Sequence, residues 1–291
     1  MPSEAVESAR PAFNKLLRHV LTFLAVLVVA RFILELVGLP HDTARYISAT
    51  VGMLFAGIYV AAVGPLRGGA QKFKQLLWPA LLIPAWTVAW VILATIIAAV
   101  LRLQRSHFAE PTDYGNWRAL GVHLLGHLAE IVIFFLLLLL LMAALHLLWR
   151  WPVTVAPGVF LGVFVIMRFW VEAMGVEPWR AAAWSSTVLI LLAGFYLGGM
   201  GARLGPTEAR KLLAPSLALG WAWRFWVYLA TLFAALIPIF KTHFFDRSQG
   251  DIAGRLLRLL AVNVLEGFIV GLIIWGIAVW IARATRPQTA A

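Results

Sequence analysis

The chain has 291 residues, of which 62% are hydrophobic and 13% are charged, and its formal net charge is +11. Soluble domains are about 45–50% apolar and about 25% charged, so this composition excludes an ordinary soluble enzyme and a disordered polypeptide. The Lys and Arg residues lie mostly at the ends of apolar segments, which indicates membrane-protein loops rather than a nucleic-acid-binding surface. We therefore predict a polytopic membrane protein whose main partner is the lipid bilayer, with no nucleic acid bound.

Eight segments are apolar and long enough to cross a membrane, at roughly 15–38, 45–64, 76–101, 118–149, 153–175, 182–201, 214–239 and 254–282. A helix needs about 20 apolar residues to cross the hydrocarbon core. The apolar runs are continuous and do not alternate as barrel strands do, so we predict an all-α integral membrane protein with eight transmembrane helices.

The distribution of Lys and Arg between the loops predicts the orientation. One side of the membrane receives about twelve Lys and Arg residues against about nine on the other. This bias favours both termini in the cytoplasm, with the protein in a bacterial cytoplasmic membrane.

The second half of the chain repeats the first at an offset of about 137 residues. The motif Arg31-Phe32-x-x-Glu35-x-x-Gly38 matches Arg168-Phe169-x-x-Glu172-x-x-Gly175, and after one deletion Glu130 matches Glu266. Charged and aromatic residues do not easily match by chance at one nearly constant offset in apolar helices. Each unit has an even number of spans, so both units enter the membrane from the same side. We predict two parallel four-helix repeats, residues 10–149 and 150–286, related by a pseudo-twofold axis along the membrane normal.

Two ion pairs are expected near the outer ends of the first and fifth spans. Arg31 and Glu35 are four residues apart on one helix face, and so are Arg168 and Glu172. A charge inside lipid costs roughly 2.5–3.5 kcal/mol on insertion scales, so each needs a partner or water. Two interpretations follow, a structural clamp between two helices or the charged lining of an outer vestibule.

Two further acids lie deeper in their spans. Glu130 and Glu266 are about 10–12 residues from the outer end of their helices, which corresponds to about 15–18 Å. Such a carboxyl group is either a neutral acid hydrogen-bonded to a neighbouring helix or a proton or cation site.

The deep acid of the fourth span shares its helix face with two histidines. His123, His127 and Glu130 are spaced i, i+4 and i+7, whereas the second repeat has Leu259 and Asn263 at the histidine positions. The imidazoles are interpreted as hydrogen-bonded interior groups, as a proton relay or, as weak candidates, as metal or haem ligands. No cofactor is predicted beyond that last alternative. The candidate intramembrane proton or ion site consists of His123, His127, Glu130, Asn263 and Glu266.

A loop motif, [RK]-[ST]-H-F-x-[ED], occurs twice, at 105–110 and 241–246, after the third and seventh spans. One interpretation is a structural loop that packs against a helix end. The functional hypothesis is a symmetric entrance on the outer face that binds an ion or ligand through His107, Glu110, His243 and Asp246.

The chain lacks the sequence motifs of common enzymes. We find no phosphate-binding loop, nucleophile elbow, zinc-protease or dinucleotide motif, and no cysteine, so no catalytic residue is assigned. This favours a non-enzymatic role.

The leading prediction is a transporter or permease for a small solute, lipid or ion that uses the paired intramembrane charges. The alternatives are a non-catalytic subunit or scaffold that binds other membrane subunits and contacts a cofactor through His123 or His127, and a membrane-embedded lipid-modifying enzyme.

Overall fold

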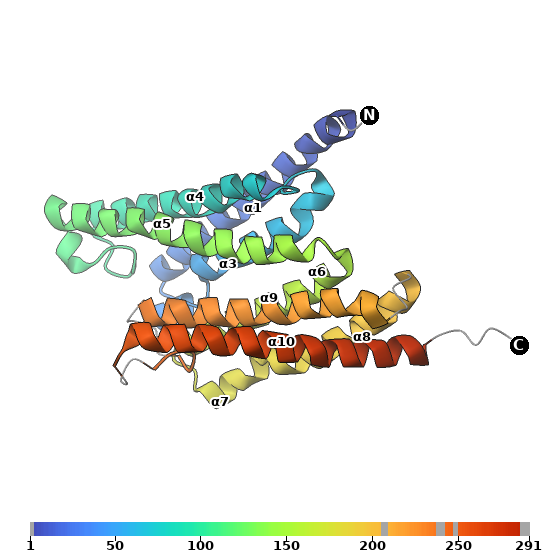
Figure 1. Ribbon diagram of the computed structural model, residues 1–291. Coiled ribbons are helices and arrows are strands. Elements are labelled where there is room, and N and C mark those ends of the chain that lie inside the picture. The colour runs from blue at the N-terminus through green and yellow to red at the C-terminus, as the bar shows by residue number, and fades with distance from the viewer. Residues whose placement is uncertain (1–2, 205–208, 237–241, 247–249, 286–291) are drawn as a thin grey trace, which may run out of the picture. The chain divides into compact units, whose positions relative to one another are not determined.

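The structure is a computed structural model that describes residues 3–204, 209–236, 242–246 and 250–285 (Figure 1). Within these residues the fold is all-α, as the sequence predicts. The chain forms two compact units, of which the first ends at Ala143 and the second begins at Ala144.

The first unit contains four long helices joined by short connections. Its elements are α1 (Ser3–Leu36), α2 (His41–Ala44), α3 (Ala49–Val63), the 3-10 helix η1 (Gly64–Arg67), α4 (Phe73–Val100), the 3-10 helix η2 (Pro111–Asp113) and most of α5 (Trp117–Leu148). Helices α1, α3 and α4 contact one another, and α5 packs on α3 where Leu138 and Met142 lie against Gly57.

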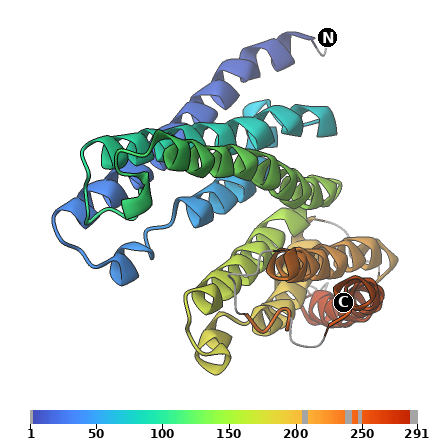
Figure 2. The same ribbon diagram turned by 90° about the vertical axis from the view of Figure 1, so that its left-hand side faces the viewer.

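The second unit also contains four long helices. Its elements are η3 (Pro152–Thr154), α6 (Val155–Ala173), α7 (Pro178–Ala181), η4 (Ala182–Trp184), α8 (Ser186–Leu204), α9 (Ala209–Leu236) and α10 (Ile252–Ala284). Helices α9 and α10 are antiparallel and lie side by side in both views (Figures 1 and 2).

Eight helices of the described residues are long and apolar enough to cross a membrane, which confirms the predicted number. They are Pro11–Leu36, Ala49–Arg67, Phe73–Val100, Trp117–Leu148, Pro152–Ala173, Pro178–Gly201, Arg210–Leu236 and Ile252–Ala284. Continuous apolar runs produce these helices because lipid leaves the backbone no hydrogen-bond partner outside its own helix.

Glycine allows a close contact between α9 and α10 in the second unit. A Cβ atom on Gly220 of α9 would lie 2.5 Å from the carbonyl oxygen of Gly267 and 2.6 Å from the backbone nitrogen of Gly271 in α10. The backbones of the two helices therefore touch, through the small-x-x-x-small pattern that Gly267 and Gly271 form.

Helices α1 and α6 end in the same way, and the glycine of the repeated motif explains why. Gly38 and Gly175 have φ angles of +103° and +88°, a left-handed conformation that glycine adopts at little cost. In each case the glycine N–H donates to the carbonyl of the glutamate three residues earlier, at 3.0 Å for Glu35 and 2.8 Å for Glu172. Each glutamate is thus held in the last turn of its helix, next to the point where the chain turns away.

Candidate functional site

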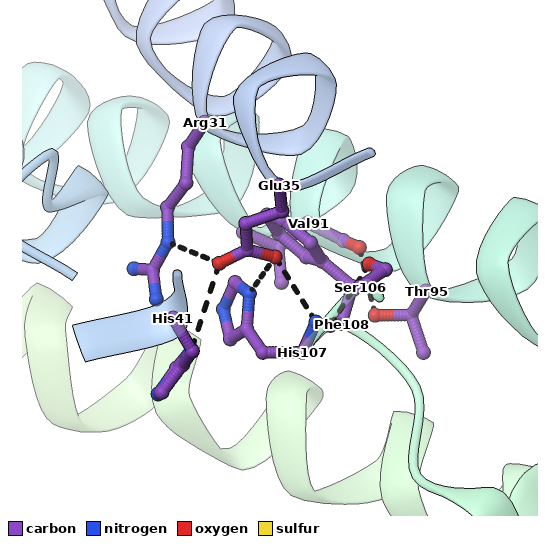
Figure 3. A network of polar contacts seen from close by, with 8 residues as sticks. All are labelled: Arg31, Glu35, His41, Val91, Thr95, Ser106, His107 and Phe108. Carbon is purple, nitrogen blue, oxygen red and sulfur yellow. Dashed lines mark hydrogen bonds and ion pairs between the residues drawn. The ribbon is translucent and has the colours of Figure 1, made fainter. Parts of the chain in front are cut away.

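The carboxylate of Glu35 is the centre of a polar cluster at the end of α1 (Figure 3). Its Oε1 lies 3.4 Å from Arg31 Nε, and its Oε2 accepts a hydrogen bond of 3.0 Å from the backbone N–H of His107. The same Oε2 is 2.6 Å from His107 Nδ1. Glu35 is 1% exposed, so these contacts replace the water that a carboxylate otherwise requires. We call this cluster of Arg31, Glu35 and His107 the first clamp.

Aromatic packing brings the loop after α4 to the clamp. Phe108 is buried, and its ring packs edge-on against Phe32 of α1 with centroids 5.6 Å apart. The hydroxyl of Ser106 accepts from the N–H of Phe108 at 3.2 Å, which fixes the loop backbone next to His107. The loop is therefore anchored by an apolar side chain while its histidine faces Glu35.

His107 lies outside the membrane-spanning segments, and its pKa is lowered to about 4. Burial is the main cause, and the positive charge of Arg31 adds to it. The imidazole is therefore neutral at pH 7. Because a carboxylate only accepts hydrogen bonds, the ring hydrogen is on Nδ1 and points to Glu35.

A second histidine borders the first clamp without joining its hydrogen bonds. His41, the first residue of α2, has its Nδ1 3.6 Å from Glu35 Oε1, which is too long for a hydrogen bond. Its ring lies beside that of His107, with centroids 5.1 Å apart (Figure 3). The ligand atoms of Glu35, His41 and His107 all lie within 4.8 Å of one another.

The second unit contains a clamp with the same contacts. Arg168 Nε lies 3.2 Å from Glu172 Oε1, and Glu172 Oε2 accepts a hydrogen bond of 2.8 Å from the backbone N–H of His243. His243 Nδ1 is 2.5 Å from the same oxygen. Glu172 is 1% exposed, like Glu35. We call Arg168, Glu172 and His243 the second clamp.

The acids of the repeated loop motif lie outside the two clamps. Glu110 lines a pocket described below, and its backbone N–H donates to Asp113 at 2.8 Å. The carbonyl of Asp246 accepts a hydrogen bond from Arg255. A shared entrance formed by both loops stays a prediction. Lys241, the first residue of the second motif, lies outside the described residues.

A row of polar side chains begins just before α5 and continues along its N-terminal part. Asp113 Oδ2 lies 2.8 Å from His123 Nδ1, and His127 Nδ1 lies 3.1 Å from Glu130 Oε2. The two imidazole rings are neighbours, with centroids 4.9 Å apart. Glu130 comes 13 residues after Trp117, where α5 begins, and this is about 20 Å along the helix axis. We call Asp113, His123, His127 and Glu130 the polar row.

A polar pocket of about 540 Å³ opens at the start of the polar row. Its lining includes the first two residues of that row, Asp113 and His123, together with Glu110, Asn116 and Arg118. The pocket carries both signs of charge and is continuous with the row through Asp113, whose side chain is 4% exposed. The pocket therefore ends beside the first imidazole of the polar row.

Glu266 has a different environment from Glu130. It forms an ion pair with Arg224 of α9, and the guanidinium of Arg224 also lies 4.9 Å from the centre of the Trp223 ring. Asn263 is buried, and its Nδ2 donates to the carbonyl of Leu259 in its own helix at 2.7 Å. Its Oδ1 has no hydrogen-bond partner among the described residues. The structure thus brings Glu130 to a histidine and Glu266 to an arginine.

Sequence reasoning missed two participants, Asp113 and His41, and it did not pair Arg224 with Glu266. Asp113 and His41 belong to single helical turns between the long helices, which are too short for helical periodicity to show which side chains meet. Arg224 is recognisable as a charge inside a span, but its pairing with Glu266 depends on how α9 and α10 pack. A usable signal also existed for Asp113 and His41, because their connections and the loop of His107 are predicted on the same side of the membrane.

Eight apolar helices make this chain an integral, polytopic membrane protein. Comparison with protein-family models, with curated proteins and with solved structures finds no match. Its function is therefore inferred from the geometry of its own residues.

Proposed function

We propose that the chain is a membrane transporter or permease in which a proton or cation moves along the polar row. The observation that carries this proposal is the unbroken succession of contacts from the polar pocket through His123 and His127 to Glu130. Imidazole groups gain and lose protons between about pH 5 and 8. Carboxylates inside membrane spans commonly mark proton and ion pathways.

The predicted duplication belongs to the same proposal. Two clamps with the same contacts, each closing on a glutamate that precedes a left-handed glycine, support a common origin of the two halves. We infer two parallel repeats around a pseudo-twofold axis. The polar row then represents a feature that only one repeat has kept, because Leu259 and Asn263 stand at the histidine positions of the other.

The central test is the variant Glu130→Gln. Gln keeps the shape of the acid and can still accept from His127, but it neither ionises nor releases a proton. We expect normal yield and folding, with proton flux lowered by at least about a hundredfold, the lower end of the usual effect of removing a proton-transferring group. The measurement uses liposomes that contain the purified chain and a pH-sensitive dye, with a potassium diffusion potential as the driving force.

The matched control is Glu177→Gln, which removes an exposed acid outside the polar row. It should conduct protons as the wild type does, while His127→Ala should resemble Glu130→Gln. The proposal is wrong if wild-type liposomes are no faster than protein-free liposomes, or if Glu130→Gln matches the wild type across a range of pH.

A role as a subunit of a larger membrane complex is the second candidate, and one observation favours it. The side chains of Glu130 and Glu266 are 45% and 44% exposed, and exposed apolar residues share their helix faces, Ile133 three residues after Glu130 and Ile269 three residues after Glu266. An acid on a lipid-facing surface is costly, and a helix from another protein would cover it. In that case the chain alone shows no flux in liposomes and gains activity only with its partner.

Sidedness of the loops is also part of the proposal, and the absence of cysteine makes it directly testable. Lys72→Cys lies in the connection before α4, which we place in the cytoplasm, and Gln104→Cys lies in the connection after it. Both positions are exposed. In intact cells a membrane-impermeant maleimide should label Gln104→Cys and leave Lys72→Cys unlabelled until the membrane is permeabilised. The reverse pattern would invert the orientation.

A further inference from the structure

The clamp does not explain the position of His41. Among the described residues the second clamp has the same contacts without a second imidazole, because the residue that matches His41 at the repeat offset is Pro178. Yet α2 is anchored by Ala44, which is 0% exposed, and this anchor holds His41 beside His107. The first clamp thus carries an additional nitrogen ligand that its structural role does not require.

Two imidazoles and a carboxylate form a ligand set that divalent transition metals favour. Zn²⁺ in particular binds histidine nitrogen and carboxylate oxygen, and three protein ligands leave one position for water. The ligand atoms of Glu35, His41 and His107 lie within 4.8 Å of one another, so small side-chain movements suffice to surround one ion.

We propose that Glu35, His41 and His107 bind one Zn²⁺ ion at the end of α1. In this site the ion takes the place of the proton between His107 Nδ1 and Glu35 Oε2, which are 2.6 Å apart. Zinc–ligand bonds of about 2.0–2.1 Å require these two atoms to separate to roughly 3.3 Å in a tetrahedral arrangement. The ring hydrogen of His107 moves by exchange with solvent from Nδ1 to Nε2, so the imidazole stays neutral, and the freed Nδ1 lone pair forms the bond to the metal.

Arg31 lowers the affinity of the site for a cation. Its Nε lies 3.4 Å from Glu35 Oε1, so a guanidinium remains next to the bound cation and opposes it. His41 is also exposed, with 54% of its side chain accessible, which leaves an open path to solvent. Both features fit an exchangeable ion rather than a permanently bound structural one. The inference is independent of the transport proposal, because no residue of the polar row takes part.

The test uses the full chain, purified in detergent with a histidine-free tag and stripped with EDTA. Isothermal titration with Zn²⁺, checked by metal analysis after dialysis, should give one tight site in the wild type. His41→Ala should weaken that site by at least about tenfold, since loss of even an outer partner typically costs 10–100-fold. His41 makes no clamp hydrogen bond, so the unfolding temperature of the metal-free variant should equal that of the wild type.

Two controls distinguish this site from other histidines. His19→Ala removes an exposed imidazole elsewhere on α1, and the double variant His123→Ala/His127→Ala removes those of the polar row. Both should keep the tight site. The proposal is overturned by a wild type that binds no stoichiometric Zn²⁺, by a His41→Ala variant that binds as tightly as the wild type, or by tight binding that only the double variant loses.

Discussion

Replacing Glu35 by alanine is expected to lower the free energy of unfolding by roughly 3–5 kcal/mol, the typical cost of removing one partner of a buried ion pair. The substitution leaves the guanidinium of Arg31 and the backbone N–H of His107 without the acceptor they now share. The apparent unfolding temperature in detergent with EDTA, followed by tryptophan fluorescence, measures the loss.

The double variant Arg31→Leu/Glu35→Leu should cost less than Glu35→Ala alone, because it removes both charges and leaves no lone ion in apolar surroundings. A double variant that is less stable than the single one would contradict an electrostatic clamp. Glu172→Ala should produce a loss similar to that of Glu35→Ala, since a duplicated clamp stabilises both units in the same way.

Gly220→Ala is expected to separate α9 from α10 and to lower the free energy of unfolding by about 1–3 kcal/mol, the usual cost of overpacking. The added methyl group would meet backbone atoms of Gly267 and Gly271 at 2.5–2.9 Å, and a backbone cannot turn away as a flexible side chain can. Folded yield and unfolding temperature in detergent give the result.

The control for this prediction is Gly276→Ala in α10. No atom lies within 4 Å of a Cβ placed there, so the substitution should be neutral or raise stability by about 0.5–1 kcal/mol through helix propensity. Equal effects of the two alanines would show that the close approach of α9 and α10 contributes nothing to stability.

The helices of this protein were predictable because lipid imposes a simple rule. Every backbone group of a span must be satisfied within its own helix, so hydropathy alone locates the spans to within a few residues. The pairs Arg31 with Glu35 and Arg168 with Glu172 were also predictable, because a spacing of four fixes neighbours on a helix.

The remaining contacts of the site depend on tertiary packing. Neither hydropathy nor helical spacing predicts which distant segments pack together. Glu35 meets His107 across 72 positions of sequence, and Glu172 meets His243 across 71. The repeated loop motif marked both histidines as candidates but assigned them to an entrance together with Glu110 and Asp246. Asp113 joins His123 through a 3-10 turn, whose geometry follows from Pro111 and its hydrogen bonds rather than from any periodic pattern.

The separation of the clamp partners along the chain has a consequence for how the protein is made. Synthesis proceeds from the N-terminus, so α1 enters the bilayer before His107 exists, and only Arg31 can then offset the charge of Glu35. The clamp closes after α3 and α4 have been inserted and the following loop has emerged. The same order applies to Glu172, because its partner His243 is synthesised only after α8 and α9. In each half of the protein the arginine–glutamate pair is therefore inserted first. The histidine joins this pair later, when the loop that carries it has been synthesised.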